Sequence, residues 1–544
     1  MDYSLRPLVE VIRAQAEDAR AGDDALLRLA AHLFAIGEQL LARRRDARFS
    51  RPSRALGSKP LVLLLDHLAA LSLETDSTNL YDVVTVALQT IDGELSGKHH
   101  AAVSLRTRFP ISQVEVGGEM VLGGEVLCWR RPRSRLAELR RRRERDADDA
   151  GKRRPPDRAP HPSDCLQTVG MYWLDSRHPR VEPKDLGERT LPLVHDSGSD
   201  AAVRQCFRIA LCPLAGPFRP FFAIAGGFFT ACRHAPMIER EALHEHLHAI
   251  LEAAQRQQIH LVVLPELTID PEARELIAGW LKKRRSTEAP YGVVAGSFHV
   301  WPDEEATSPP FNESPLLDHA GGILLLHRKR GWYRITPADV VHLPGSFENG
   351  EQHAANRGSL PLEIPEGIRH GSTLRVLDTS LGRLAILICA DAIEADEHGY
   401  MPVVKRMRPD LLFVVSMSRE TERFDATSQV LARHGIGTVF VNAACVCNQK
   451  RKATLLSCDL ALFQPEGWAQ TWLRWQAGDE EVELYDRYPP RKDGRGQDKG
   501  WRKLDRTVQD HPGIRWLTSG PERGKSLGVV LDLGVFWGEK GPEP

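Results

Sequence analysis

The C-terminal part of the sequence alternates between short apolar runs typical of buried strands and amphipathic runs typical of helices. The apolar runs include FRIALCPL, IHLVVLPEL, YGVVAGSFHV, GGILLLHRK, RLAILICAD, DLLFVVSMS, GTVFVNAAC and SLGVVLDLGVF. Between them lie helical patterns such as MIEREALHEHLHAILEAAQRQQ, whose apolar residues recur every three or four positions. Strands that alternate with helices form an α/β domain, because each helix links and covers neighbouring strands. The pattern therefore predicts an α/β domain over residues 205–544.

The first 129 residues have a different pattern. Apolar residues such as Leu8, Ile12 and Ala16 recur at helical spacing, and similar groups continue to Ile91. This predicts a mainly helical N-terminal region over residues 1–129, with a short β-like patch near its end. Residues 130–204 are rich in charge and proline, which predicts a linker. Nothing in the N-terminal region indicates its role.

The overall charge is close to zero. The chain has 72 basic and 73 acidic residues and 42% hydrophobic residues, as expected for a soluble globular protein. These values exclude a uniformly basic nucleic-acid coat and an acidic disordered chain. Arg130–Arg158 is an exception, with thirteen basic and six acidic residues. A solvated linker is the preferred interpretation, and a protein or nucleic-acid contact is the alternative, since clustered arginines neutralise phosphates.

The number of cysteines and the N-terminal sequence indicate in which cellular compartment the protein is expected. Nine cysteines in 544 residues are few and odd in number, which favours a reducing, cytoplasmic environment over a disulfide framework. The N-terminus has no apolar run behind a basic start, so no signal peptide is predicted. The apolar stretch from Ile209 to Cys232 contains three prolines and Arg219. A buried strand and a loop are expected there rather than a membrane span.

Three residues with chemical potential follow predicted strands. Glu266 follows HLVVLP, Lys329 follows GGILLLHR and Cys389 follows GRLAILI. A carboxylate can take the proton of a thiol as the sulfur attacks, and an ammonium can stabilise the oxyanion that forms. The carboxylate can then protonate the leaving amine and activate water. These three residue types therefore suffice for acyl transfer from an amide to water through a thioester, and no metal or organic cofactor is expected.

The same segments resemble a known family. LVVLPEL, LLLHRK and LAILICAD, in this order, look like the three signature motifs of the nitrilase, or carbon–nitrogen hydrolase, superfamily. The resemblance implies that Glu266 is the general base, Lys329 the oxyanion-stabilising residue and Cys389 the nucleophile. Asn312 and Asp391 match residues that flank these motifs. The resemblance extends from about residue 206 to the C-terminus.

Fold and activity follow as expectations from this resemblance. It implies an α-β-β-α sandwich that hydrolyses a non-peptide C–N bond of a small-molecule amide or nitrile, with an amide favoured. It also implies a homodimer formed by helices that follow the nucleophile. Two other functions share the same motifs. One is a catalytically degenerate sensor or signalling module coupled to the N-terminal region, and the other is an acyltransferase with an amine as acceptor.

A second glutamate shortly after the lysine is implied by the family pattern. The segment HLPGSFENGE offers Glu348 and Glu351, of which Glu348 is preferred. The sequence departs from the pattern here, because RGWYRITPADVV is inserted between Lys329 and HLPG. A loop at this place would border the pocket, so the sequence does not predict the substrate.

A zinc site is the competing chemical interpretation. The segment HEHLH matches the H-E-x-x-H pattern, in which His244 and His248 would bind the metal and Glu245 would act as base. The pattern is short and no third ligand accompanies it. Surface histidines on a helix are therefore preferred, and no metal is predicted.

Overall fold

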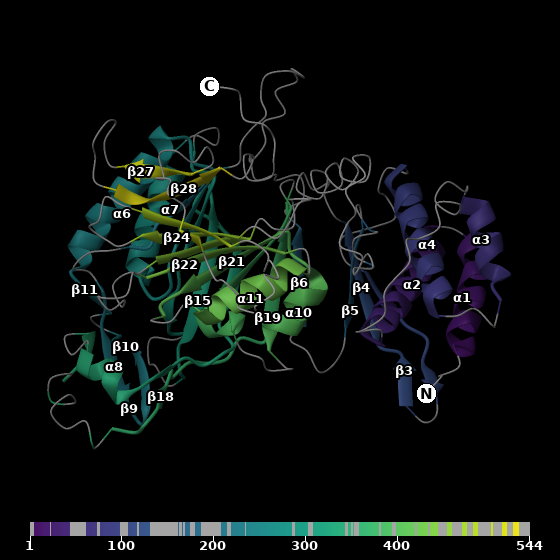
Figure 1. The fold of residues 1–544 in the computed structure, drawn as a ribbon, viewed down its shortest axis with the longest axis horizontal. Coiled ribbons are helices and arrows are strands. Elements are labelled where there is room, and N and C mark those ends of the chain that lie inside the picture. Colours follow the sequence, from purple (N-terminus) through teal and green to yellow (C-terminus); the bar gives the residue numbers. More distant parts are fainter. Residues whose placement is uncertain are drawn as a thin grey trace, which may run out of the picture. The chain divides into compact units, whose positions relative to one another are not determined.

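The computed structural model of the chain consists of two units, Met1–Asp185 and Leu186–Pro544 (Figure 1). In the first unit the structure describes residues 5–21, 23–43, 61–72, 77–97, 107–116, 119–130, 162, 166, 169–174 and 180–185. In the second unit it describes 208–443 without 215–218, 234–235, 285–288, 303–307, 343–345, 350–351, 353–357, 359, 380–381, 394–398, 419–421 and 434–435, and then 454–459, 470–475, 482–487, 502–503, 514–518 and 526–532.

Helices form the first half of the N-terminal unit and strands the second half. The helices are α1 (Arg6–Asp18), α2 (Asp23–Arg43), α3 (Leu61–Ala69) and α4 (Ser77–Gly97). The strands are β1 (Thr107–Pro110), β2 (Val114–Val116), β3 (Glu119–Leu122), β4 (Glu125–Arg130), β5 (Val169–Leu174) and β6 (Arg180–Asp185). The helices predicted in this region are confirmed.

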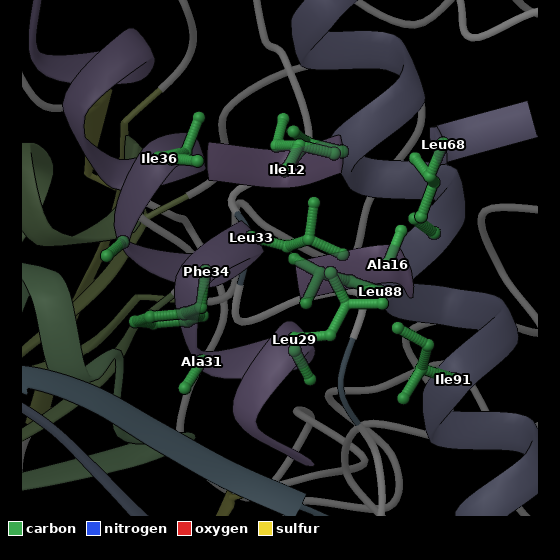
Figure 2. Packing of buried hydrophobic residues seen from close by; sticks show 14 of the residues in the cluster. Ile12, Ala16, Leu29, Ala31, Leu33, Phe34, Ile36, Leu68, Leu88 and Ile91 are labelled. Atoms are coloured by element: carbon green, nitrogen blue, oxygen red, sulfur yellow. The ribbon is translucent and has the colours of Figure 1, made fainter. Parts of the chain in front are cut away.

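Apolar residues at helical spacing build the core of this unit. Leu8, Ile12 and Ala16 of α1 lie on one face, and each is at most 1% exposed. They belong to one buried cluster with Leu33 of α2 and Leu88 of α4, several of whose members Figure 2 shows. The hydrophobic periodicity is therefore explained by packing, with no functional role needed for these residues.

The predicted linker extends too far. Strand β5 lies inside residues 130–204 but pairs antiparallel with β4 over its whole length, and the backbone N–H of Val169 donates to the buried carboxylate of Asp92 at 3.1 Å. The short apolar run VGMYWL was masked in the sequence by the charged residues around it. The segment 131–158, which carries the proposed protein or nucleic-acid contact, lies outside the described residues.

The first sheet of the C-terminal unit has a parallel centre. Its strands are β7 (Arg208–Leu211), β12 (Leu261–Leu264), β13 (Gly292–Ala295), β14 (Phe298–Val300), β15 (Phe311–Asp318), β16 (Ile323–Arg328), β27 (Ile514–Thr518) and β28 (Ser526–Asp532). The strand order is β14-β15-β13-β12-β7-β28-β27, and β16 also pairs with β15. Strands β7, β12 and β13 are parallel, as expected of strands linked by helices.

The second sheet contains the strands that follow in the sequence. They are β19 (Thr373–Asp378), β20 (Arg383–Ile388), β21 (Leu411–Ser416), β22 (Gly437–Asn442), β23 (Thr454–Asp459), β24 (Gln470–Trp475), β25 (Val482–Arg487) and β26 (Arg502–Lys503). They lie in the order β26-β25-β24-β23-β22-β21-β20-β19. Strands β20, β21 and β22 are parallel.

Helices cover the outer faces of both sheets (Figure 1). They are α6 (Arg240–Arg256) and α7 (Pro271–Lys282) on the first sheet, and α10 (Tyr400–Met407) and α11 (Glu422–Arg433) on the second. One buried cluster joins α6 and α7 to residues of both sheets, among them Ala295 at the end of β13 and Met417 directly after β21. The expected α-β-β-α arrangement is confirmed.

Small elements complete this unit. They are β8 (Arg219–Pro220), β9 (Phe222–Ala225), β10 (Phe228–Ala231), β11 (Met237–Ile238), β17 (Arg334–Ile335), α8 (Pro337–His342) and β18 (Ile364–Pro365). The stretch after Ile209 that is apolar enough to suggest a membrane span thus contains short strands. No helix in the described part of either unit is long and apolar enough to cross a membrane.

Gly296 shapes the turn between β13 and β14. Its φ of 54° is in the left-handed region, and a Cβ there would lie 2.2 Å from the carbonyl oxygen of Pro265. We expect Gly296→Ala to destabilise the C-terminal unit by about 2 kcal/mol, because backbone would have to move. Gly279→Ala in α7 is the control, since a Cβ there meets nothing within 4 Å. It should be neutral or stabilising by up to about 1 kcal/mol in thermal or chemical unfolding.

Candidate active site

The three residues singled out in the sequence lie at the ends of strands from both sheets. Glu266 follows β12 in the first sheet, Lys329 follows β16, and Cys389 follows β20 in the second sheet. Strand β16 also contacts β19 and β20, which brings the two sheets together here. The three side chains are buried, with Glu266 2% exposed and the other two 0% exposed.

A strained turn carries the cysteine. Cys389 has a φ of 43°, and the chain passes directly from β20 into the short 3-10 helix Cys389–Ala392. A non-glycine residue rarely adopts this conformation, and such outliers concentrate at functional sites. Some enzymes place their nucleophile on a sharp turn of this kind between a strand and a helix.

Lys329 binds two carboxylates at once. Its Nζ lies 2.7 Å from Oε1 of Glu266 and 2.6 Å from Oε2 of Glu366. An ammonium has three N–H donors, so one donor remains after these two ion pairs. Asn312 supports both carboxylates, because its Nδ2 donates to Glu266 at 3.1 Å and to Glu366 at 2.9 Å.

The second glutamate of the site is Glu366, and the prediction of Glu348 is wrong. Glu348 is exposed and its backbone N–H binds the carbonyl of Phe222, whereas Glu366 is 1% exposed and contacts Lys329. Glu351 lies outside the described residues. The insertion after Lys329 forms β17 and α8, which lengthen the chain before the glutamate returns to the site.

Glu366 has a recognisable place in the chain, although none of the predicted motifs contains it. It follows β18 and precedes the segment GIRHG, which leads into β19. Strand β19 pairs antiparallel with β20, the strand that ends at Cys389. A glutamate just before that hairpin is therefore carried toward the nucleophile, which is the signal that could have identified it.

The two carboxylates differ in their proton affinity. Burial raises the pKa of Glu266, although Lys329 opposes this effect and Glu366 adds to it. Burial also acts to raise the pKa of Glu366, but Lys329 and hydrogen bonds from its neighbours lower it to about 2. Glu366 therefore stays ionised and holds the lysine, while Glu266 is the group that accepts a proton more readily.

The same buried surroundings shift the pKa values of Lys329 and Cys389. Burial acts to lower the pKa of Lys329, but the carboxylates of Glu266 and Glu366 raise it well above its usual value. Burial raises the pKa of the Cys389 thiol, and Glu266 raises it further, while Lys329 opposes the shift. The lysine is thus a permanent cation and the cysteine is a thiol at neutral pH. For such a thiol to act as a nucleophile, a base would have to take its proton.

Asp391 ties the nucleophile turn to the lysine segment. Its Oδ1 accepts from the backbone N–H groups of Arg330 at 2.9 Å and Gly331 at 2.7 Å. Its Oδ2 accepts from Nε2 of His327 at 2.8 Å and from the N–H of Ile388 at 3.4 Å. A single carboxylate therefore binds residues on both sides of Lys329 and the residue before Cys389, which sets the separation of the two segments.

The alternative zinc site finds no support among the described residues. His244 is half-buried in α6 and His248 is exposed. No group of three or more His, Cys, Asp or Glu side chains in the described segments is arranged to hold a metal ion.

Comparison with known proteins agrees with the motifs. Residues 229–455, which contain Glu266, Lys329, Glu366 and Cys389, match the family model of the carbon-nitrogen hydrolases. The C-terminal unit is a carbon-nitrogen hydrolase domain. The match begins in β10 and ends in β23, so it spans both sheets of the hydrolase domain. No curated protein matches the chain.

Solved structures that resemble the chain have low sequence identity to it. Nit3 of Saccharomyces cerevisiae, a member of branch 10 of the nitrilase superfamily, is 14% identical, with 52% of this chain and 90% of Nit3 covered and a TM-score of 0.32. The NitFhit protein of C. elegans is 16% identical over 48% of this chain and 57% of its own, with a TM-score of 0.33. An amidase from Nesterenkonia sp. is 14% identical over 50% and 85%, with a TM-score of 0.29.

Asp391→Asn tests whether this carboxylate positions the site. Asparagine has one oxygen, so its NH2 group would face a buried donor on one side. We expect the hydrolase domain to lose about 2–3 kcal/mol of stability, measured by thermal unfolding. Asp318→Asn is the matched control. Its carboxylate closes a turn by accepting from Ala320 and Gly322 through Oδ1 alone, which asparagine can reproduce. A change beyond about 0.5 kcal/mol in the control, or none in Asp391→Asn, would contradict the assignment.

Proposed function

We propose that the hydrolase domain cleaves the C–N bond of a small-molecule amide through a thioester on Cys389. One observation carries this proposal. Lys329 forms ion pairs with Glu266 and Glu366, and these place a cation and a basic carboxylate beside the buried thiol of Cys389. The chemistry needs these groups and no others from the protein. An amide is favoured over a nitrile because the resemblance to the superfamily implies amidases more often.

Thioester formation starts with proton transfer. Glu266 takes the thiol proton as Sγ of Cys389 attacks the carbonyl carbon, which converts the carbonyl oxygen into an oxyanion. The remaining N–H of Lys329 stabilises that charge in a site with little water, where such an interaction is strong. The C–N bond then breaks, Glu266 returns the proton to the leaving nitrogen, and ammonia or an amine departs.

Hydrolysis of the thioester follows the same steps, with water in place of the thiol. Glu266 takes a proton from water as its oxygen attacks the thioester, and Lys329 again stabilises the oxyanion. The carbon–sulfur bond breaks, the sulfur recovers the proton from Glu266, and a carboxylic acid is released. Glu366 does not exchange protons, because its low pKa keeps it ionised, and its role is to hold Lys329.

Cys389→Ala should remove the activity. In a screen of amides and nitriles for ammonia release, we expect a loss of at least about a thousandfold in kcat/KM, since no nucleophile remains. Cys212→Ala is the control, because Cys212 is an equally buried thiol of the same domain. It should stay within about threefold of the unchanged protein. Intact mass spectrometry of quenched reactions should detect an acyl adduct on Cys389.

The result also separates the alternatives. Ammonia release that persists in Cys389→Ala would refute the thioester mechanism. A wild-type protein that binds small molecules but releases no ammonia from any of them would favour the sensor. Acyl transfer would instead give an amide product when an amine is added.

The pH profile tests the assignment of the base. Glu266 must be ionised in the free enzyme, and burial raises its pKa above 4.5, so the acidic limb of kcat/KM should lie above pH 4.5. Glu366, with a pKa of about 2, should not contribute to this limb. The measurement is kcat/KM from pH 4 to 9, with circular dichroism to verify folding. Activity that stays level down to pH 4.5 would assign the proton transfer to another group.

A further inference from the structure

A buried histidine that belongs to none of the predicted motifs contacts Glu366. His299 lies in β14 and is 1% exposed. Its Nε2 is 2.9 Å from Oε1 of Glu366, and its Nδ1 is 2.8 Å from the backbone nitrogen of Ala231. The imidazole therefore lies between a carboxylate of the site and the end of β10.

The two contacts define which ring nitrogen carries the proton. A backbone N–H can only donate, so Nδ1 of His299 accepts from Ala231. In a neutral imidazole the other nitrogen then carries the hydrogen. Nε2 therefore donates to Glu366, and a second proton on Nδ1 would be directed at the N–H of Ala231. The surroundings thus select one tautomer of a neutral ring.

His299 completes the set of donors around Glu366. Oε1 accepts from His299 and from Nδ2 of Asn312, while Oε2 accepts from Nζ of Lys329 and from the N–H of Tyr333 at 3.3 Å. A carboxylate has about four acceptor positions, so all are occupied. Rotation of Glu366 would break contacts on both oxygens, and without His299 only Asn312 would hold Oε1.

We propose that His299 is a positioning residue for the hydrolysis, which fixes Glu366 so that this carboxylate orients Lys329 toward the reacting carbonyl. The proposal rests on the proposed function of this site. His299 contacts neither the thiol nor Glu266 through a hydrogen bond in the structure, so it acts through Glu366.

The same histidine connects the site to the hairpin of β9 and β10. Ala231 is the last residue of β10, and the carbonyl of Phe229 in the same strand accepts from the N–H of Gly367, directly after Glu366. The ring of Phe222 packs against the rings of both Phe229 and Phe347. The hairpin thus binds both His299 and the backbone beside Glu366, so it supports the carboxylate from two directions.

The titratable groups that face Glu366 provide a second test of the proposal. They are Lys329, Glu266 and His299. The hydrogen bond from His299 contributes to the low pKa of Glu366, so its loss should raise that pKa. If that pKa rises into the range of Glu266, Glu366 takes up a proton and releases Lys329 within the pH range of the assay, and the acidic limit of activity moves upward.

Two substitutions separate the contacts of the ring. His299→Gln places an amide N–H2 where Nε2 lies, so it keeps the donor to Glu366 and loses the acceptor for Ala231. His299→Asn places an amide oxygen near Nδ1, so it keeps the acceptor and loses the donor. The expected result for His299→Asn is a decrease in kcat of about tenfold to a hundredfold, with KM changed less than about threefold and the acidic limb at higher pH. His299→Gln should stay within about threefold of the unchanged protein and keep the limb in place.

A purely structural role of His299 predicts the opposite order of activity for the two variants. If His299 serves only to hold the hairpin, His299→Asn retains activity and His299→Gln loses it, and the proposal is overturned. Equal activity of both variants and the unchanged protein overturns it as well. Should His299→Asn not fold, His299→Gln decides alone, because loss of activity with an unchanged Tm contradicts the proposal and retained activity supports it.

A measurement without substrate distinguishes this proposal from the proposed function. The rate of Cys389 alkylation by iodoacetamide, followed by peptide mass spectrometry across pH, reports the state of Glu266 and Lys329 beside the thiol. We expect His299→Asn to shift this pH dependence and His299→Gln to leave it unchanged. An unchanged protein that releases no ammonia would refute the proposed function, whereas identical alkylation profiles in all three proteins would refute the role of His299.

Discussion

A fully buried ammonium is the constraint on which the hydrolase domain depends. Lys329 is 0% exposed, and an isolated charge in such a place would cost several kcal/mol. Two carboxylates within 2.7 Å compensate it. Because Glu266 and Glu366 come from different parts of the chain, the lysine can be buried only when the first sheet and the segment before β19 are both in place. The site therefore exists only where this fold brings these segments together.

Two carboxylates surround one ammonium, so the site has a net charge of −1 when both glutamates are ionised. The two glutamates differ in how readily they take up a proton. Glu366 has four donors and remains ionised, whereas burial makes Glu266 the more basic carboxylate. In the proposed mechanism, this difference gives proton transfer to Glu266 and leaves Glu366 to hold Lys329. Glu266 accepts hydrogen bonds as well, from Asn312, Lys329 and the backbone N–H of Met417, but its pKa is raised rather than lowered. In the proposed mechanism it is therefore the carboxylate that changes its protonation.

The three motif residues and the α/β class could be predicted from the sequence because their signals are local. Glu266, Lys329 and Cys389 each follow an apolar run that forms a strand, and such runs are visible without knowledge of the fold. Glu366 could not be found in the same way. The insertion of β17 and α8 separates it from Lys329, and Glu348 stood closer to the expected distance. Strand β5 was missed for a similar reason, since its short apolar run lies among charged residues.

The sequence by itself determined which residue types follow the strands and which helices have an apolar face, because these depend on composition and period along the chain. The tertiary structure decided which of several glutamates meets the lysine, how Asp391 joins two distant turns, and that His299 lies against Glu366. Those contacts join residues 37 to 68 positions apart. These contacts depend on the pairing of strands and the packing of two sheets. The spacing of residues along the chain does not show which of them will meet.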